Sequence, residues 1–437
     1  MAEPFHFEHS VAFSPENASE VLRAIPALPG VFALHGPHVE GQSEAEPYLT
    51  RAADLRRRIT RILAPPEPSA DGRPAQSKRL NLRSRVARID YTVTGSEFES
   101  ALTLYHASAS IFSLVEARRR LRLHTPFFLR FTAENAFPRV YSTNRLSRRA
   151  LAHTYGPFPS RAAADRYCDA VLDLFKLRRC YEDLAPYPEH PGCVYQEMKK
   201  CLAPCNQACT PEGAATYTAE AAAVEAFFDT HGESLLTQLT TDREQASADL
   251  DFERASQLHA QFQRVKAAAA LADPLVQPIP KLRSAIVQKS SQPTTPCKDE
   301  PTAAIFLLTA GYLVGPERLA PAAELTPTDS ADKAAPSPED RAAGLLDDLA
   351  IRARPHPRSA PDLATLSDHL SLLRRWYYRP EKQRVGEVFF PKDDSLDQTT
   401  WPIRRILNAA ARMALGDSTP TSKAPYQPPQ TPIEAGG

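Results

Sequence analysis

The first third of the chain carries two hydrophobic periods, one typical of strands and one typical of helices. A turn and a short strand are predicted from Pro29, where the sequence is PGVFALHG. Within Pro47–Leu63, the residues Leu55, Ile59 and Ile62 recur at three- and four-residue steps. This spacing predicts an amphipathic helix whose other faces carry arginines.

Further elements follow the same patterns. Arg85–Gly95 alternates like a strand, and Ser96 stands three residues before Glu99, the spacing of a capping box at the start of a helix. The runs FFLRFT and PRVYSTNRL predict two more strands. Residues 1 to about 20 are polar and are expected to be irregular.

Helical patterns dominate the remaining chain, with continuous helical periodicity from Tyr217 to about Ala272. The run AAIFLLTAGYLVGPERL predicts a strand hairpin, and three helices are expected to begin near Ser337, Ala360 and Pro402. We therefore predict an α+β chain. Its expected N-terminal parts are a small α/β unit at 21–130, a linker with clustered cysteines at 131–215 and a helical hairpin at 216–275. A second linker region follows at 276–345, in which 276–300 is expected to be irregular and the rest to include a possible strand hairpin. The chain is then expected to form a helical region at 346–416 and to end in a disordered tail at 417–437.

Composition narrows the function classes. The 437 residues include 52 Lys+Arg and 52 Asp+Glu, so a uniformly basic nucleic-acid coat is excluded while a local basic patch is not. The longest nearly apolar stretch, Ala303–Gly315, is shorter than the ~20 residues that span a bilayer. The start of the chain has no apolar signal core, so we expect a cytoplasmic protein.

One stretch departs from this neutral balance. Between Arg51 and Arg88 there are eleven Lys/Arg and three acidic residues, and four of the arginines, at 56, 57, 58 and 61, fall within two turns of one predicted helix. Guanidinium groups bind phosphate oxygens in fixed, often bidentate geometry. The segment predicts contact with a nucleic-acid backbone, and the alternative is a solvated arginine face.

Five of the seven cysteines fall within thirty residues. Their spacing is C-x12-C-x7-C-x3-C from Cys180 through Cys193 and Cys201 to Cys205, with Cys209 four residues beyond. Because a reducing compartment disfavours disulfides, we predict a metal site, either tetrahedral zinc or an iron–sulfur cluster. The alternative is a set of reduced, buried thiols.

The order of motifs resembles a known family. PGVF, YLTRA and LRRR together resemble the GIY-YIG endonuclease module, in the form found at the N-terminus of proteins of the UvrC excinuclease family. FPRVYSTNRL, KKCLAPC and LDFERASQLHAQFQRV resemble later segments of that family, the last being its UVR motif. The resemblance runs in order from Pro29 to Lys266.

The resemblance implies a metal-dependent nuclease site with several replacements. Tyr48 matches the second motif tyrosine, Arg58 the phosphate-binding arginine and Arg51 the family lysine. Phe32 replaces the first tyrosine and Leu104 replaces the metal-binding glutamate, so neither position offers the expected oxygen. Neighbouring Glu97 and Glu99 do not reach the same point on the helix. Mg²⁺ is therefore expected only if the site is active.

The same resemblance implies a 4Fe–4S cluster on the four cysteines, where the residues alone leave zinc open. It implies contact with a UvrB-like helicase subunit through residues 240–270, although the family's Arg-Asp pair is His259-Ala260 here. The family's ribonuclease-H-type domain and helix-hairpin-helix motifs have no counterpart that we find. For the run RRWYY at 374–378, stacking on nucleic acid and packing in a core both remain open.

Three functions follow from these observations. The first is a UvrC-like nucleotide excision repair protein that binds DNA through Arg51, Arg56, Arg57 and Arg61, with a degenerate nuclease site. The second is an active metal-dependent GIY-YIG endonuclease. The third is a metal- or redox-responsive interaction protein that does not bind DNA.

Overall fold

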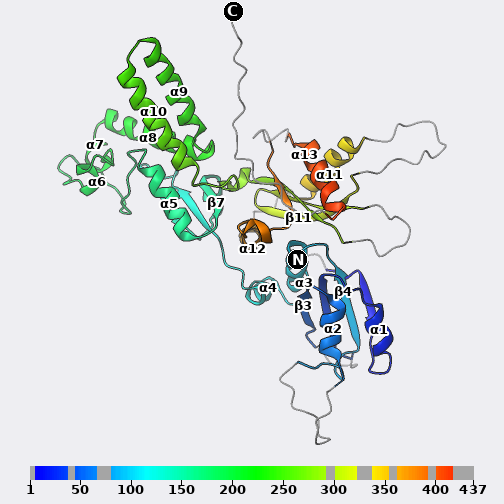
Figure 1. Cartoon of the computed structure of the whole chain (residues 1–437). Helices are drawn as coiled ribbons and strands as arrows, with labels where there is room; N and C mark the ends of the chain where they lie inside the picture. Colours follow the sequence, from blue (N-terminus) through cyan, green and yellow to red (C-terminus); the bar gives the residue numbers. More distant parts are fainter. Residues whose placement is uncertain are drawn as a thin grey trace, which may run out of the picture.

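The computed structural model describes residues 5–37, 45–65, 80–291, 301–321, 337–353, 362–391 and 400–416. Three four-stranded sheets organise these residues, each with its own helices (Figure 1). The predicted tail at 417–437 lies outside the described residues. The predicted combination of helices and strands in an α+β chain is thus present.

The first sheet is antiparallel, with strand order β1-β4-β2-β3. One face packs against α1 and α2 over a core that includes Phe32, Leu55 and Ile59. The other face, with Val31 and Leu49, lies toward α3. The elements are β1 (His9–Ala12), α1 (Ala18–Ala24), β2 (Gly30–His35), β3 (Tyr48–Ala52), α2 (Leu55–Leu63), β4 (Arg88–Val93), α3 (Glu97–Ile111) and α4 (Leu114–Leu121).

The second sheet, in the order β6-β5-β7-β8, lies in the middle of the chain. Its core joins the sheet to α5 and α8 through buried aromatic residues such as Tyr155, Tyr167 and Phe227. Beyond α8, the α9–α10 pair projects as a helical hairpin (Figure 1). The elements are β5 (Phe127–Phe131), β6 (Val140–Thr143), η1 (Arg148–His153), β7 (Thr154–Phe158), α5 (Arg161–Leu172), α6 (Val194–Glu197), α7 (Pro204–Gln207), α8 (Pro211–Asp229), α9 (Glu233–Ala248), α10 (Phe252–Ala269) and β8 (Gln277–Pro278).

The third sheet is antiparallel, in the order β11-β10-β9-β12. Helices α11 and α13 cover one face, and α12 covers the other. None of the helices in the described residues has the length and hydropathy needed to cross a bilayer. The elements are η2 (Ile279–Lys281), β9 (Arg283–Lys289), β10 (Ala303–Thr309), β11 (Tyr312–Leu319), α11 (Pro338–Ala353), α12 (Leu363–Tyr377), η3 (Glu381–Gln383), β12 (Glu387–Phe389) and α13 (Ile403–Ala414).

Helices α3 and α4 of the first unit share one hydrophobic core with the third sheet and α12. Phe98 of α3 packs against Phe306 of β10 and Trp376 of α12, with ring centroids 5.2 and 4.9 Å apart. At the same interface Arg118 Nε donates to Asp368 Oδ1 over 2.8 Å. A Cβ added to Gly95 would lie 2.2 Å from the carbonyl oxygen of Lys289, so the two backbones meet where only glycine fits. Helix α12 therefore lies between the third sheet and the first unit (Figure 1).

Three expectations about local structure are wrong. The helix predicted over Pro47–Leu63 is a strand, β3, followed by α2, because Tyr48-Leu49-Thr50 pairs with β2 and Asp54 caps the helix. Residues 9–12 form an edge strand rather than irregular structure. The expected linker at 276–300 contains β9, which is buried on both faces and so lacks the alternation of a half-exposed strand.

Other expectations are confirmed. Ser96 caps α3 by accepting a hydrogen bond from the Glu99 amide, and the strand hairpin after Ala303 is β10–β11.

The predicted bounds of the parts differ from the structure. The predicted end of the first unit at residue 130 falls inside β5, which belongs to the second sheet. The region predicted as a cysteine-containing linker, 131–215, includes β6, β7 and α5 of the folded middle unit and the start of α8.

Candidate functional site

Two of the expected catalytic residues meet beside the edge strand β3. Arg58 Nη2, from the second turn of α2, donates to Tyr48 Oη over 3.3 Å. Phe32 lies next to them, with its ring centroid 6.3 Å from that of Tyr48, and has no exposed surface. The first motif position is therefore part of the hydrophobic core and offers no hydroxyl group.

Leu104 and Arg51 lie in a different place. Both line a cavity of about 320 Å³ between β3, α3, α4 and α12, and Tyr48 and Arg58 are not among its lining residues. The alternation of side chains along β3 explains the separation, because Tyr48 shares the α2 face of the sheet with Phe32 while Arg51 lies on the α3 face. The residues of the predicted site therefore lie on opposite faces of the first sheet, with Tyr48 and Arg58 on the α2 side and Arg51 and Leu104 on the α3 side.

The two acidic residues near Leu104 are already occupied. Glu97 pairs with Arg379, whose Nη1 and Nη2 donate to its two oxygens over 2.5 and 2.9 Å, and with Arg51 Nη2 at 3.2 Å. The Arg379 hydrogen bond, opposed by partial burial, keeps the pKa of Glu97 low. Burial raises the pKa of Glu99 to about 7, and its Oε2 accepts from the Gly95 amide over 2.7 Å.

The basic side chains predicted to contact DNA differ in their surroundings. Arg56 Nε donates to the Ile25 carbonyl over 2.6 Å, which fixes α2 against the end of α1. The Arg57 and Arg61 side chains are exposed on the outer face of α2, and Arg51 is exposed beside Glu97. The surface that can neutralise phosphate therefore centres on Arg57 and Arg61.

The four expected metal-binding cysteines lie in the irregular segment between α5 and α8, in and around the short helices α6 and α7. Cys201 and Cys205 are buried, and Cys180 and Cys193 are half-buried. Burial, followed by the charges of the other three cysteines, raises the pKa of Cys201 to about 11. The charges of Cys180, Cys193 and Cys205 therefore act on Cys201, whereas exposed Cys209 makes no such contribution.

The chemistry of these thiols fits a thiolate-bound metal. The Ala203 amide donates to Cys201 Sγ over 3.2 Å, and Arg178 Nη1 lies 3.7 Å from Cys180 Sγ. Such donors and a nearby cation stabilise thiolates, and a bound metal would reverse the raised pKa of Cys201. Within the described residues, no three potential ligands are already arranged around one metal position.

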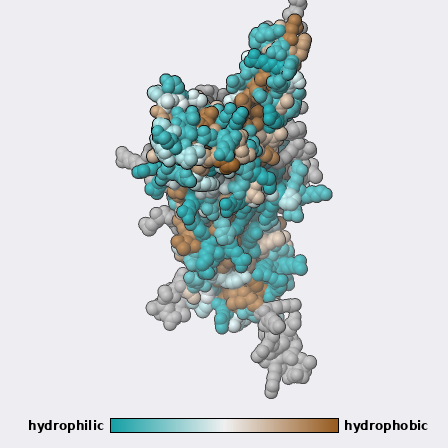
Figure 2. Space-filling model, turned by 90° about the vertical axis from the view of Figure 1, so that its left-hand side faces the viewer, coloured by the Kyte–Doolittle hydropathy of each residue, from teal (hydrophilic) through white to brown (hydrophobic). Residues whose placement is uncertain are grey.

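The α9–α10 hairpin presents hydrophobic side chains at its tip. Leu250 and Phe252 are 72% and 68% exposed, and His259 is also exposed. Small hydrophobic patches of this kind interrupt a mostly hydrophilic surface (Figure 2). Exposed apolar residues on a helical hairpin are suited to pairing with another helix.

Sequence reasoning missed the contribution of α12 and α4 to the cavity beside Leu104. Arg375 from α12, Arg379 just beyond its end and Arg120 from α4 line it. Trp376 and Tyr377 of the same helix are buried, so most of the 374–378 run packs in a core. The only sequence signal was this RRWYY run, and nothing in it indicated contact with a strand more than 300 residues earlier.

Comparisons with known proteins match the middle of the chain. Residues 127–227 match the family model of the UvrC/Cho excinuclease middle domain, and residues 233–268 match that of the UvrB/uvrC motif. The match to the motif falls on α9 and α10. No solved structure matches the chain.

Curated relatives extend the similarity to about half of the chain. The UvrABC system protein C of Idiomarina loihiensis is 28% identical over 250 residues, 56% of this chain and 37% of the relative. That of Alcanivorax borkumensis is 30% identical over 193 residues, 44% of this chain and 31% of the relative. The chain spans less than two fifths of the length of these relatives, and the predicted resemblance is confirmed over the matched part.

Proposed function

We propose that this UvrC-like chain, with its UvrC-type middle domain and UVR motif, is a DNA-binding component of nucleotide excision repair with a degenerate nuclease site. The observation that carries the proposal is the state of the first unit. Its arginine-bearing helix is retained, while Phe32 is buried in the core and Leu104 lines a cavity without offering an oxygen. Positive charge without metal ligands supports DNA binding without cleavage.

The proposed nuclease-like unit has a GIY-YIG-type arrangement. Its support is an antiparallel sheet in which PGVF and YLTRA occupy paired strands, followed by a helix carrying Arg58. The acidic residues that might replace the missing ligand are held elsewhere, Glu97 by two arginines and Glu99 in the interior. We therefore expect no Mg²⁺-dependent incision.

For the middle domain we propose a 4Fe–4S cluster, or zinc, held by Cys180, Cys193, Cys201 and Cys205. When bound, such a group would cross-link the irregular segment between α5 and α8. Arg178 and the Ala203 amide would stabilise the sulfur atoms on the protein side.

For the UVR motif we propose pairing with a UvrB-like helicase subunit. The support is the exposed Leu250 and Phe252 at the tip of the hairpin. His259 and Ala260 lie on the exposed surface of α10, in place of the charged pair that the family has there.

The test is DNA binding and nicking by anaerobically purified protein. Fluorescence anisotropy with a bubble-containing duplex should give a salt-dependent affinity. In an Arg57→Ala/Arg61→Ala variant the slope against salt should decrease by about 1–2, since each phosphate contact contributes about 0.9. Arg404→Ala, at an exposed arginine on α13, is the control and should behave as wild type.

Supercoiled plasmid with Mg²⁺ or Mn²⁺ completes the experiment. We expect binding without nicking above background. Nicking that disappears in Arg58→Ala would show an active endonuclease and overturn the degenerate site. A slope unchanged in the double variant would remove α2 from the DNA-binding surface.

A further inference from the structure

The cavity beside Leu104 is built by parts of the chain that are far apart in sequence. Its walls come from β3, α3 and α4 of the first unit and from α12, which packs on the third sheet. Arg51, Arg120, Arg375 and Arg379 line it, and we call it the arginine cavity. Glu97 is the one carboxylate among its lining residues. Its volume of about 320 Å³ is at the lower end of the range for small-molecule sites.

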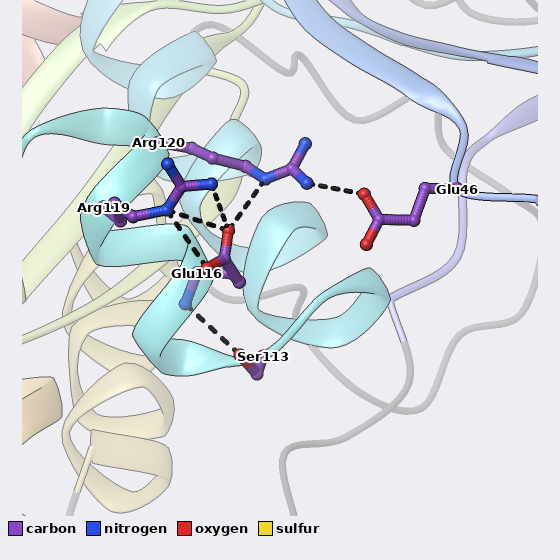
Figure 3. Close-up of polar contacts among 5 residues, drawn as sticks. All are labelled: Glu46, Ser113, Glu116, Arg119 and Arg120. Carbon is purple, nitrogen blue, oxygen red and sulfur yellow. Dashed lines mark hydrogen bonds and ion pairs between the residues drawn. The ribbon is translucent and has the colours of Figure 1, made fainter.

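The positive charge of the arginine cavity is only partly neutralised. Arg120 is bridged to Glu116 and Glu46 (Figure 3). Arg375 donates to the carbonyl groups of Leu121 and Arg122, which satisfy its hydrogen bonds without cancelling its charge. Partial burial and the neighbouring charges of Arg374 and Arg51 lower the pKa of Arg375. An anion in the cavity would relieve this repulsion.

Glu97 occupies the position that an external oxyanion would take. Both terminal nitrogens of Arg379 donate to it in a fork, and Arg51 approaches one of the same oxygens. Arginine binds carboxylate and phosphate with the same bidentate geometry, so this fork is already arranged for a phosphate. The Glu97 side chain is 54% exposed, which leaves it free to turn away.

The remaining wall is hydrophobic and aromatic. Phe112 is half-buried, and the Arg120 guanidinium lies 3.7 Å from its ring centroid. Leu104 and Trp376 add further apolar surface. Aromatic rings and guanidinium planes are the surfaces on which nucleobases stack. Ser108 of α3 supplies a hydroxyl group on the same lining.

We propose that the arginine cavity binds the terminal phosphate monoester of a single nucleotide, with Glu97 as the internal group that the phosphate displaces. The volume admits one nucleotide rather than a length of backbone, and a monoester carries more charge than the diesters within a strand. The nucleotide is either free or at the end of a strand. The strand-end source rests on the proposed DNA-binding function, and the free nucleotide does not.

The first experiment compares probes with and without the phosphate, using the full chain. Isothermal titration with adenosine 5′-monophosphate and with adenosine tests the free nucleotide. Anisotropy with one 3′-labelled single strand, bearing either a 5′-phosphate or a 5′-hydroxyl, tests the strand end. We expect the phosphorylated member of at least one pair to bind about tenfold or more tightly, because the other member cannot form the charge-assisted hydrogen bonds with the arginines.

Two variants that break the same ion pair make the test specific. Glu97→Gln removes the internal competitor and should tighten binding of the phosphorylated probe by about threefold to tenfold. Arg379→Gln removes the fork and should weaken it by about tenfold. If breaking the ion pair only disturbed the packing of α12, both variants would bind the phosphorylated probe more weakly. The proposal therefore requires tighter binding in Glu97→Gln and weaker binding in Arg379→Gln. Arg404→Gln is the exposed control and should match wild type.

Each result separates this inference from the proposed function. No preference in either pair, or weakening in both variants, overturns the arginine cavity as a phosphate site while DNA binding through α2 stands. Binding of adenosine 5′-monophosphate by a protein that binds no DNA supports the cavity and overturns the proposed function. Preference for the phosphorylated strand supports both.

Discussion

The first unit and the cysteine segment (residues 180–205) differ in how their structure relates to the functions proposed for them. In the first unit the matching elements are present, but a ring fills the core at Phe32 and an alkyl side chain stands at Leu104. In the cysteine segment there is little regular structure, yet all four thiols are present and the charges of three of them act on Cys201. One region is a packed scaffold without the expected reactive groups, and the other carries the expected reactive groups with little regular structure.

This difference indicates what maintains each region. The strands and helices of the first unit are held by hydrophobic packing, which needs no catalytic residue. The cysteine segment has only two helices of four residues, and it is held by backbone hydrogen bonds, such as that from the Leu202 amide to the Lys176 carbonyl, and by buried residues such as Cys201 and Cys205. The metal proposed for the four thiols would add further support by cross-linking them.

The largest expected effect tests that support. Cys201→Ser in anaerobically purified protein should lose its metal and the cooperative unfolding of the middle domain, since structural zinc contributes on the order of 10 kcal/mol in small domains. Elemental analysis, visible absorbance and calorimetry measure this. Cys209→Ser, at the exposed thiol outside the cluster, should keep its metal. Equal metal content in both variants would contradict the proposal that Cys201 helps to hold a metal in the cysteine segment.

A smaller effect is expected in the first unit. Phe32→Ala should lower the free energy of unfolding by about 3–5 kcal/mol, because a fully buried ring is removed. Tyr48→Phe should cost less than about 1.5 kcal/mol, since it removes one hydrogen bond from a partly exposed group. Chemical denaturation, with hydrogen exchange at β2, measures both. Equal losses would mean that Tyr48, too, has become a core residue.

The buried carboxyl group of Glu99 on α3 makes the stability of the fold depend on pH, and this dependence can be tested. Its pKa is raised by burial from 4.5 to about 7, so the folded state binds this proton more tightly than the unfolded state. Glu99 therefore destabilises the fold above pH 7, and this cost disappears as the pH falls from about 7 to 4.5. Nearby Arg318 offsets part of the cost, and Glu8 adds to it.

The matched variant is Glu99→Gln, which keeps an oxygen to accept from the Gly95 amide. It should be more stable than wild type at pH 8 by on the order of 1–3 kcal/mol, with a flatter profile between pH 7 and 5. Denaturation at several pH values measures this. Parallel profiles for the two proteins would mean that the Glu99 carboxylate is solvated rather than buried.

The smallest effect on stability is expected at the hairpin. Phe252→Ser should change the free energy of unfolding by less than about 0.5 kcal/mol, because the ring is 68% exposed, but should weaken binding to a purified UvrB-like protein. Ile351→Ser on α11, where the side chain is 64% exposed, is the control. Equal binding by both variants would exclude the tip of the hairpin as the contact.

Much of the local structure could be predicted from the sequence, because its signals are local. The Ser96 cap, the strand at PGVFALHG and the helices after Tyr217 each depend on residues close together in the chain. The expected helix over 47–63 failed at Tyr48–Ala52, where pairing with β2 outweighs the neighbouring helical periodicity. Strand β9 was missed because burial on both faces removes the alternation that reveals a strand.

The candidate site was predictable only in part, for a similar reason. Tyr48 and Arg58 are ten residues apart and meet as expected. The engagement of Glu97 by Arg379 links residues 282 positions apart, and no periodicity encodes such a contact. The division of Leu104 and Arg51 from Tyr48 follows from side-chain alternation along β3, which becomes visible only once that segment is known to be a strand.

The packing of Phe98 against Trp376 also constrains how the chain is made. About 280 residues separate the two rings, and at ~5–20 residues per second the ribosome needs roughly a quarter of a minute to a minute to synthesise them. During that time the apolar face of α3 has been synthesised but α12 has not. The first unit therefore completes its packing after the middle domain has had time to fold, and the nascent chain is an expected client of chaperones that shield hydrophobic surface.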